Sequence, residues 1–186
     1  MKIVAVNVGG KKEILWKGKL IETGIFKYAV EEPVFLDVEH VKDDVICDRK
    51  HHGGVDQAVY GYSLKHYQYW KEIYPNVDWQ YGMFGENLTI DDLDETQLHV
   101  GDRFQVGHAI LEVTKPRVPC LKLGLRFNDM KIVKKFWNST FSGVYFKVLK
   151  TGFVRSEDVF IPLKLCKENP TIAEVYQEKG SRKGMS

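Results

Sequence analysis

Residues 97–120 read QLHVGDRFQVGHAILEVTKPRVPC, and this stretch decides the fold class. It holds three short strand-like runs, at 97–100, 103–106 and 109–115, which are separated by Gly101-Asp102 and Gly107-His108. Two dipeptides that begin with glycine, at such short spacing, favour tight hairpin turns. Apolar and polar side chains alternate from Leu111 to Thr114, which is typical of a strand with one buried face. The stretch therefore predicts an antiparallel meander.

Short runs of the same kind continue on both sides of the meander. We expect further strands at residues 1–8, 19–23, 34–38, 143–149 and 153–163, with the last two paired across Thr151-Gly152. Helices are few, and we expect them at residues 64–74 behind a Ser63 cap, after Asp129 with Ile132, Val133 and Phe136 inward, near Pro119, and within 171–177. Many short strands with few helices predict a mainly β chain (α+β by content) that forms a β-barrel with short peripheral helices. We expect one barrel domain over residues 1–163, followed by a short tail at 164–186 with one helix and a disordered end from Lys179.

Composition narrows the function classes. The net charge of +2 offers no electrostatic footprint for nucleic acid, and no apolar run is long enough to span a bilayer. The N-terminus begins like a strand and lacks a signal-peptide pattern. Three cysteines without CxxC spacing argue against a disulfide framework and a structural zinc site. We expect a cytoplasmic protein that binds neither nucleic acid nor membrane.

The meander leads directly into Lys115-Pro116-Arg117-Val118-Pro119-Cys120. Pro119 stiffens the backbone just before Cys120 and can open a helix, which places the thiol in a fixed direction. Arg117 adds a permanent cation that favours a thiolate or holds an anionic ligand. The alternative is a turn after a strand whose cysteine is simply buried.

A second cluster spans residues 48–59 and contains His51, His52 and two glycines. The glycines suggest a loop in which the backbone closely approaches a ligand. A metal site built with Cys47 and Asp56 is disfavoured, because adjacent histidines point apart in a strand and no second half-site follows. The alternative is a polar turn with solvated histidines.

Two smaller clusters offer polar groups beside glycines. Asn87 follows Gly85 and presents both a donor and an acceptor to a polar heterocycle. Thr23 and Lys27 flank Gly24 with a hydroxyl and an ammonium, and the ammonium suits a phosphate. Taken singly, the first is a glycine turn before a strand and the second a solvated surface lysine.

Together these segments resemble the MOSC domain, the module named after the C-terminal part of molybdenum cofactor sulfurases, and more closely its YiiM-like branch of stand-alone bacterial proteins. The resemblance covers the chain from Met1 to about residue 163. The matching segments are Thr23-Gly24-Ile25-Phe26-Lys27, Asp48-Arg49-Lys50-His51-His52-Gly53-Gly54, His66-Tyr67 with Trp70, Phe84-Gly85-Glu86-Asn87-Leu88, Val100-Gly101-Asp102 and Pro116-Arg117-Val118-Pro119-Cys120.

The resemblance implies a pyranopterin molybdenum cofactor, with Cys120 as the thiolate ligand to molybdenum. It also implies that a set of residues contacts the pterin or its phosphate, or lines the pocket edge. This set is Thr23, Lys27, His51, His52, Gly53, Asn87 and Arg117. Thiolate is a soft ligand that suits such a metal.

The implied activity is reduction of N-hydroxylated compounds, of the hydroxylamine or hydroxylaminopurine type. Cys120 and His52 would be the catalytic residues, with His52 supplying a proton. The chain shows no flavin, haem or iron–sulfur motif, so a separate protein would donate electrons, and a homodimer is possible. Three other functions stay open: a cofactor carrier or sulfur-transfer protein with a persulfide on Cys120, a cysteine hydrolase that pairs Cys120 with His51 or His52, and a barrel that only binds a small anion.

Overall fold

The predicted meander forms one side of a mixed eight-stranded sheet. In this computed structural model, which describes residues 1–47 and 53–182, β8 (Arg103–Val106) and β9 (Ala109–Pro116) pair as an antiparallel hairpin that closes at Val106 and Ala109. β10 (Val144–Lys150) adds to the other edge of β9. The full strand order is β12-β8-β9-β10-β6-β7-β1-β4.

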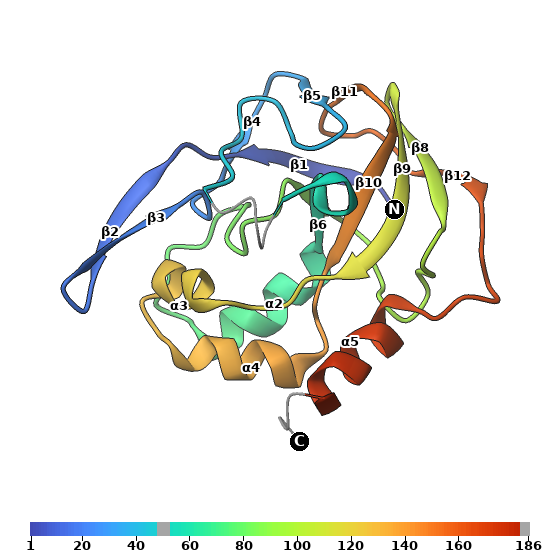
Figure 1. Cartoon of the computed structure of the whole chain (residues 1–186). Helices are drawn as coiled ribbons and strands as arrows, with labels where there is room; N and C mark the ends of the chain where they lie inside the picture. Colours follow the sequence, from blue (N-terminus) through green and yellow to red (C-terminus); the bar gives the residue numbers. More distant parts are fainter. Residues whose placement is uncertain (48–52, 183–186) are drawn as a thin grey trace.

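The remaining strands of this sheet are β1 (Ile3–Val8), β4 (Tyr28–Val30), β6 (Val59–Ser63), β7 (Leu88–Ile90) and β12 (Ile161–Lys164). The neighbours are antiparallel except β6 and β7, which run parallel. The register of β9 with β10 shifts at two places, and such irregularities bend a strand and increase its twist. The sheet consequently curls into a half-barrel (Figure 1), which confirms the mainly β fold class.

Two short strand pairs extend from this sheet. β2 (Lys12–Trp16) and β3 (Lys19–Thr23) form a hairpin that projects from the body (Figure 1). β5 (Val34–Leu36) pairs with β11 (Gly152–Val154). The base of the first hairpin, at Thr23, is buried, which brings this segment to the interior.

Four α-helices and one 3-10 turn complete the described chain. They are η1 (Val55–Gln57), α2 (Leu64–Ile73), α3 (Leu121–Phe127), α4 (Lys131–Ser139) and α5 (Ile172–Arg182). Helices α2, α3 and α4 gather along one side of the half-barrel (Figure 1). An aromatic cluster packs between them and the sheet, with Tyr62, Trp70, Phe84 and Phe136 at its centre. A second, mainly aliphatic core cluster is formed largely by strand residues such as Ile3, Leu88, Leu111 and Val148.

Several sequence-based expectations are wrong in detail. Residues 97–100 form no strand: Asp94 accepts hydrogen bonds from Thr96 N and Gln97 N in the turn that precedes them, and His99 makes only an isolated bridge with Thr171. Residues 153–163 do not pair with β10; β11 joins β5, and β12 joins β8. Ser63 precedes α2, but its side chain makes no capping hydrogen bond.

The end of the chain also differs from expectation. Helix α5 extends to Arg182, so residues 179–182 are helical, and the rest of the expected disordered end lies outside the described residues. Tyr176 of α5 is buried, stacks on Trp137 at 5.0 Å and donates a hydrogen bond to Phe136 O. The helix of the tail is therefore packed against α4. Within residues 1–47 and 53–182, no helix combines the length and apolar character needed to cross a bilayer.

Candidate functional site

A polar pocket opens where β3, the turn after Met83, β6 and the β9–α3 connection meet. The empty space between its lining atoms, with the open solvent at its mouth, is about 600 Å³. Its lining residues are Thr23, Gly24, Ile25, Lys27, Asp44, Val45, Ile46, Cys47, Gln57, Ala58, Tyr60, Gly85, Asn87, Arg117, Cys120, Lys122 and Tyr145.

Cys120 is placed in this pocket by the local chain geometry that the sequence predicts. It is the N-cap residue of α3, with extended backbone (φ −135°, ψ 176°), and its carbonyl accepts the Leu123 N–H at 3.0 Å. The strand β9 ends at Pro116, so three residues separate the sheet from Cys120. The side chain is half-buried and faces the cavity.

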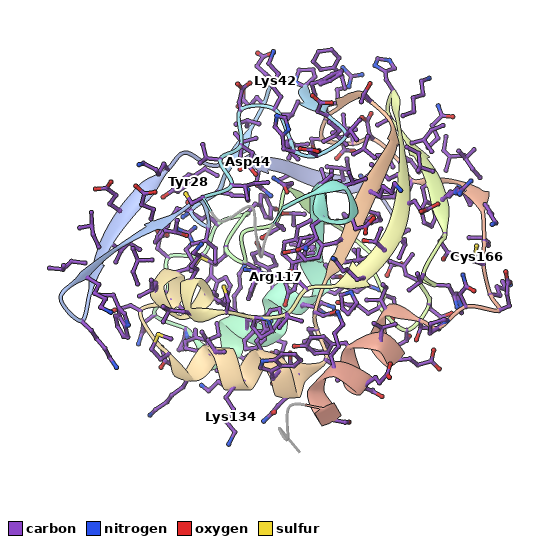
Figure 2. All side chains as sticks on the ribbon, in the orientation of Figure 1. Tyr28, Lys42, Asp44, Arg117, Lys134 and Cys166 are labelled. Carbon is purple, nitrogen blue, oxygen red and sulfur yellow. The ribbon has the colours of Figure 1, made fainter. Side chains whose placement is uncertain are left out.

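Arg117 supplies a buried guanidinium beside the thiol. Its Nη1 donates a hydrogen bond to the Phe84 carbonyl, and its guanidinium lies 4.9 Å from the centroid of the Tyr60 ring. Figure 2 shows Arg117 in the middle of the molecule, between the sheet and the helices. Burial lowers the pKa of Arg117, but Tyr60, Tyr145 and Cys120 act in the opposite direction, and the net pKa lies above its ordinary value. The guanidinium is therefore a permanent buried cation.

Lys27 brings a second buried cation, which forms an ion pair with Asp44. Both side chains are nearly inaccessible to solvent, with exposed fractions of 8% and 2%. Burial lowers the pKa of the Lys27 ammonium, and the nearby Asp44 carboxylate partly offsets this effect. Asn87 lies next to the pair, because its Nδ2 donates to Asp44 Oδ2 at 3.0 Å.

Two glycines let the backbone come close to the pocket. A Cβ atom on Gly24 would lie 1.8 Å from the Val45 carbonyl oxygen, so any side chain there collides with backbone. Gly85 has φ +76°, which favours glycine, and a Cβ atom would lie 2.8 Å from Ile25 Cγ1. Thr23 closes the same corner, since its Oγ1 accepts the Ile25 N–H at 3.1 Å.

A buried carboxylate behind the pocket holds the loop that carries Gly85 and Asn87. Glu86 accepts hydrogen bonds from Gly82 N and Phe84 N at 3.0 Å each, and from the Thr89 hydroxyl at 2.9 Å. The Tyr67 hydroxyl also donates to it. Burial raises the pKa of Glu86, while these donors act to lower it. The loop is thereby fixed from within the protein.

The structure brings most of the predicted site residues together. Thr23, Lys27, Asn87, Arg117 and Cys120 come from distant segments and all line the one pocket. Gly53 is half-buried, does not line it and precedes η1. His51 and His52 lie outside the described residues.

The alternative metal cluster of Cys47, His51, His52 and Asp56 includes two residues outside the described chain, so it stays untested. Across residues 1–47 and 53–182, no three His, Cys, Asp or Glu side chains are grouped to hold a metal ion. Asp56 is exposed in η1 and does not line the pocket.

Sequence reasoning missed several lining residues. The most consequential is Asp44, which occupies a polar Lys42-Asp43-Asp44 run that reads as ordinary surface. Tyr60 and Tyr145 were missed because only the pairing of β6 with β10 brings them together, opposite each other in register. Cys47 and Lys122 also line the pocket, and burial raises the pKa of Cys47.

Comparisons of this chain with known proteins point to the same family. The MOSC domain model matches residues 48–160. YflK of Bacillus subtilis, described as uncharacterized, is 36% identical over 152 residues, which cover 82% of this chain and 68% of that protein. YiiM of Escherichia coli is 32% identical over 158 residues, which cover 84% of this chain and 68% of that protein.

A fungal protein and a solved structure extend this comparison. A protein of Gibberella moniliformis named "Reductase" is 33% identical over 144 residues, which cover 76% of this chain but 26% of that longer protein. The crystal structure of YiiM from Geobacillus stearothermophilus superposes with a TM-score of 0.79 at 29% identity, covering 96% of this chain and 83% of that one. The fold described above is thus shared along nearly the whole chain.

Proposed function

The chain belongs to the MOSC domain family, within its YiiM-like branch, and from this premise we propose that its pocket binds a pyranopterin molybdenum cofactor and reduces N-hydroxylated compounds. The observation that carries the proposal is the convergence of Cys120, Arg117 and Lys27 on one pocket. A soft thiol and two buried cations within one cavity suit a ligand that combines a soft metal with an anionic group.

The residues present fit such a group. Arg117 and Lys27 are cations held out of bulk water, where their attraction for a phosphate is screened less than at the surface. Gly24 and Gly85 lie in the pocket wall, where a side chain at either position would collide with Val45 or Ile25 and displace the wall.

Each residue then has a distinct part. Cys120 would be the metal ligand, and its place at the end of a stiff segment orients the sulfur. Arg117 and Lys27 would bind the phosphate, Asn87 would hydrogen-bond the heterocycle, and Thr23 would close the cavity wall. When bound in this pocket, the cofactor would supply the two-electron redox chemistry that the reaction needs.

The overall reaction needs two electrons and two protons for each N–O bond that is broken, and it releases an amine and water. We propose that a separate protein donates the electrons and that His52 delivers a proton. Burial raises the pKa of Tyr60 and of Tyr145 above the ordinary value for a phenol, so these two side chains bind and orient rather than ionise.

The experiment measures hydroxylamine reduction by cofactor-loaded protein, with reduced methyl viologen as electron source. Turnover is expected for the wild type and should be absent in Arg117→Met, which keeps the side-chain length and removes the charge. Lys134→Met is the matched control, since Lys134 is exposed on α4, away from the pocket lining. Bound molybdenum without turnover in the wild type would contradict the reductase and favour a carrier.

A further inference from the structure

Asp44 is a buried carboxylate in the pocket wall that the chemistry above does not use. We infer that Asp44 is a positioning residue, which holds the Lys27 ammonium and the Asn87 amide in the orientation that an anionic ligand meets. This inference rests on the proposed function of the pocket. Asp44 is negatively charged, as the proposed ligand is. Its role would therefore be to orient the two side chains that meet the ligand.

The contacts of Asp44 reach three separate segments. Its Oδ1 accepts the Gly9 N–H at 2.9 Å, just after β1. Its Oδ2 accepts the Asn87 Nδ2–H at 3.0 Å and also forms the ion pair with Lys27. One carboxylate therefore ties the segment after β1, the segment before β4 and the segment before β7 to one point.

The orientation of the Asn87 amide is fixed at both ends. Its Oδ1 accepts the Tyr60 N–H at 3.2 Å, and its Nδ2 donates to Asp44 and, more distantly, to Asn7 O at 3.4 Å. A flipped amide would place its oxygen against the Asp44 carboxylate and lose these bonds. Asp44 thereby fixes the orientation in which the Asn87 amide meets a ligand in the pocket.

The ion pair also governs the charge of Lys27. Burial is the largest influence and lowers the Lys27 pKa, and Arg117 lowers it further. Asp44 opposes both effects through its charge and its hydrogen bond, with a smaller contribution from Glu86. The other titratable groups that line the cavity are Cys47, Cys120, Lys122, Tyr60 and Tyr145.

A buried lysine without an opposite charge tends to lose its proton near neutral pH. Such a lysine would no longer attract a phosphate. The anionic Asp44 is therefore compatible with an anion site, because it maintains the cation that the ligand needs.

The test is an NMR titration of the Lys27 side chain in the ligand-free protein, in wild type and in Asp44→Asn. Asparagine has nearly the same shape and can still accept the Gly9 N–H, so the fold is retained. Loss of the charge should lower the pH at which Lys27 deprotonates by about 1–3 pH units. The Asn87 side-chain amide protons should also exchange with solvent faster in the variant.

Asp43→Asn is the matched control, because it removes one carboxylate at the adjacent position. Asp43 is exposed and has φ 64°, a conformation that asparagine tolerates. Its Lys27 titration should equal that of the wild type. Asp44→Ser should reproduce the shift of Asp44→Asn and keeps the test independent of one substitution.

An unchanged or raised Lys27 midpoint in folded Asp44→Asn and Asp44→Ser would overturn the inference. The same holds if Asp43→Asn shifts the midpoint equally, since the effect would then be general electrostatics. Failure of the proposed function is separate, because it would appear as wild-type protein without molybdenum while the Lys27 titration stays as expected.

Discussion

The hydrogen bond from Tyr67 to Glu86 offers a sharp test of how the site is supported. Tyr67 and Glu86 are both buried, and Glu86 organises the loop that carries Asn87. Tyr67→Phe removes one hydroxyl and keeps the ring, which packs edge-on against Phe84 at 5.3 Å. The substitution also leaves Met83 N without the acceptor that it has at 3.2 Å.

The expected cost follows from the charge of the acceptor. A hydrogen bond to a charged group contributes about 1.5–3 kcal/mol to stability. For a protein of this size, 1 kcal/mol shifts the melting temperature by about 2–4 °C. Tyr67→Phe should therefore melt about 3–12 °C below the wild type at pH 7.5.

The cost should depend on pH in a definite direction. Burial raises the folded-state pKa of Glu86 above its ordinary value, and the Tyr67 hydrogen bond counteracts this rise. A carboxyl with a raised folded pKa binds more protons when folded, so stability falls as pH rises from the unfolded pKa through the folded one. Without the Tyr67 hydroxyl the folded pKa rises further. The loss in Tyr67→Phe should thus be larger at pH 7.5 than at pH 5.

Thermal melts followed by circular dichroism at both pH values measure this. Tyr28→Phe is the matched control, because Tyr28 is exposed and its ring keeps its contact with Arg126. It should melt like the wild type. Equal melting of Tyr67→Phe and wild type at pH 7.5, or a larger loss at pH 5, would refute the reasoning.

Two further substitutions test packing at the pocket and at the tail. Gly24→Ala should lower the free energy of unfolding in urea by about 1–3 kcal/mol, because its Cβ would meet the Val45 carbonyl oxygen at 1.8 Å. An unfolding midpoint equal to that of the wild type would show that the pocket wall rearranges to accept the methyl group. Tyr176→Ala should cost about 3–5 kcal/mol, since it empties a buried aromatic site beside Trp137. Unfolding with wild-type stability would instead mean that α5 detaches without affecting the body.

The parts of the fold that local sequence determines were predictable. The β8–β9 hairpin follows from Gly107 and the alternation after it, and the start of α3 follows from Pro119. These signals act over a few residues, where turn geometry and backbone restriction dominate. Cys120 could therefore be placed correctly at the end of a strand and the start of a helix.

The pairing of distant strands was not predictable from such signals. β11 follows β10 directly in sequence but pairs with β5 from the first part of the chain, and no local pattern marks this partner. The same limit applies to the site. Asp44 reads as a surface residue, and only its long-range contacts with Gly9 and Asn87 reveal a buried carboxylate.

The central claim is that Cys120 binds molybdenum in this pocket. The direct measurement is the molybdenum content of protein produced in a host that synthesises molybdopterin, in wild type, Cys120→Ser and Cys166→Ser. Cys166 is buried and donates to Gly101 O, away from the pocket lining (Figure 2), so it controls for loss of any thiol. We predict molybdenum in wild type and Cys166→Ser and its loss in Cys120→Ser. Equal molybdenum in all three, or none in the wild type, would contradict the account.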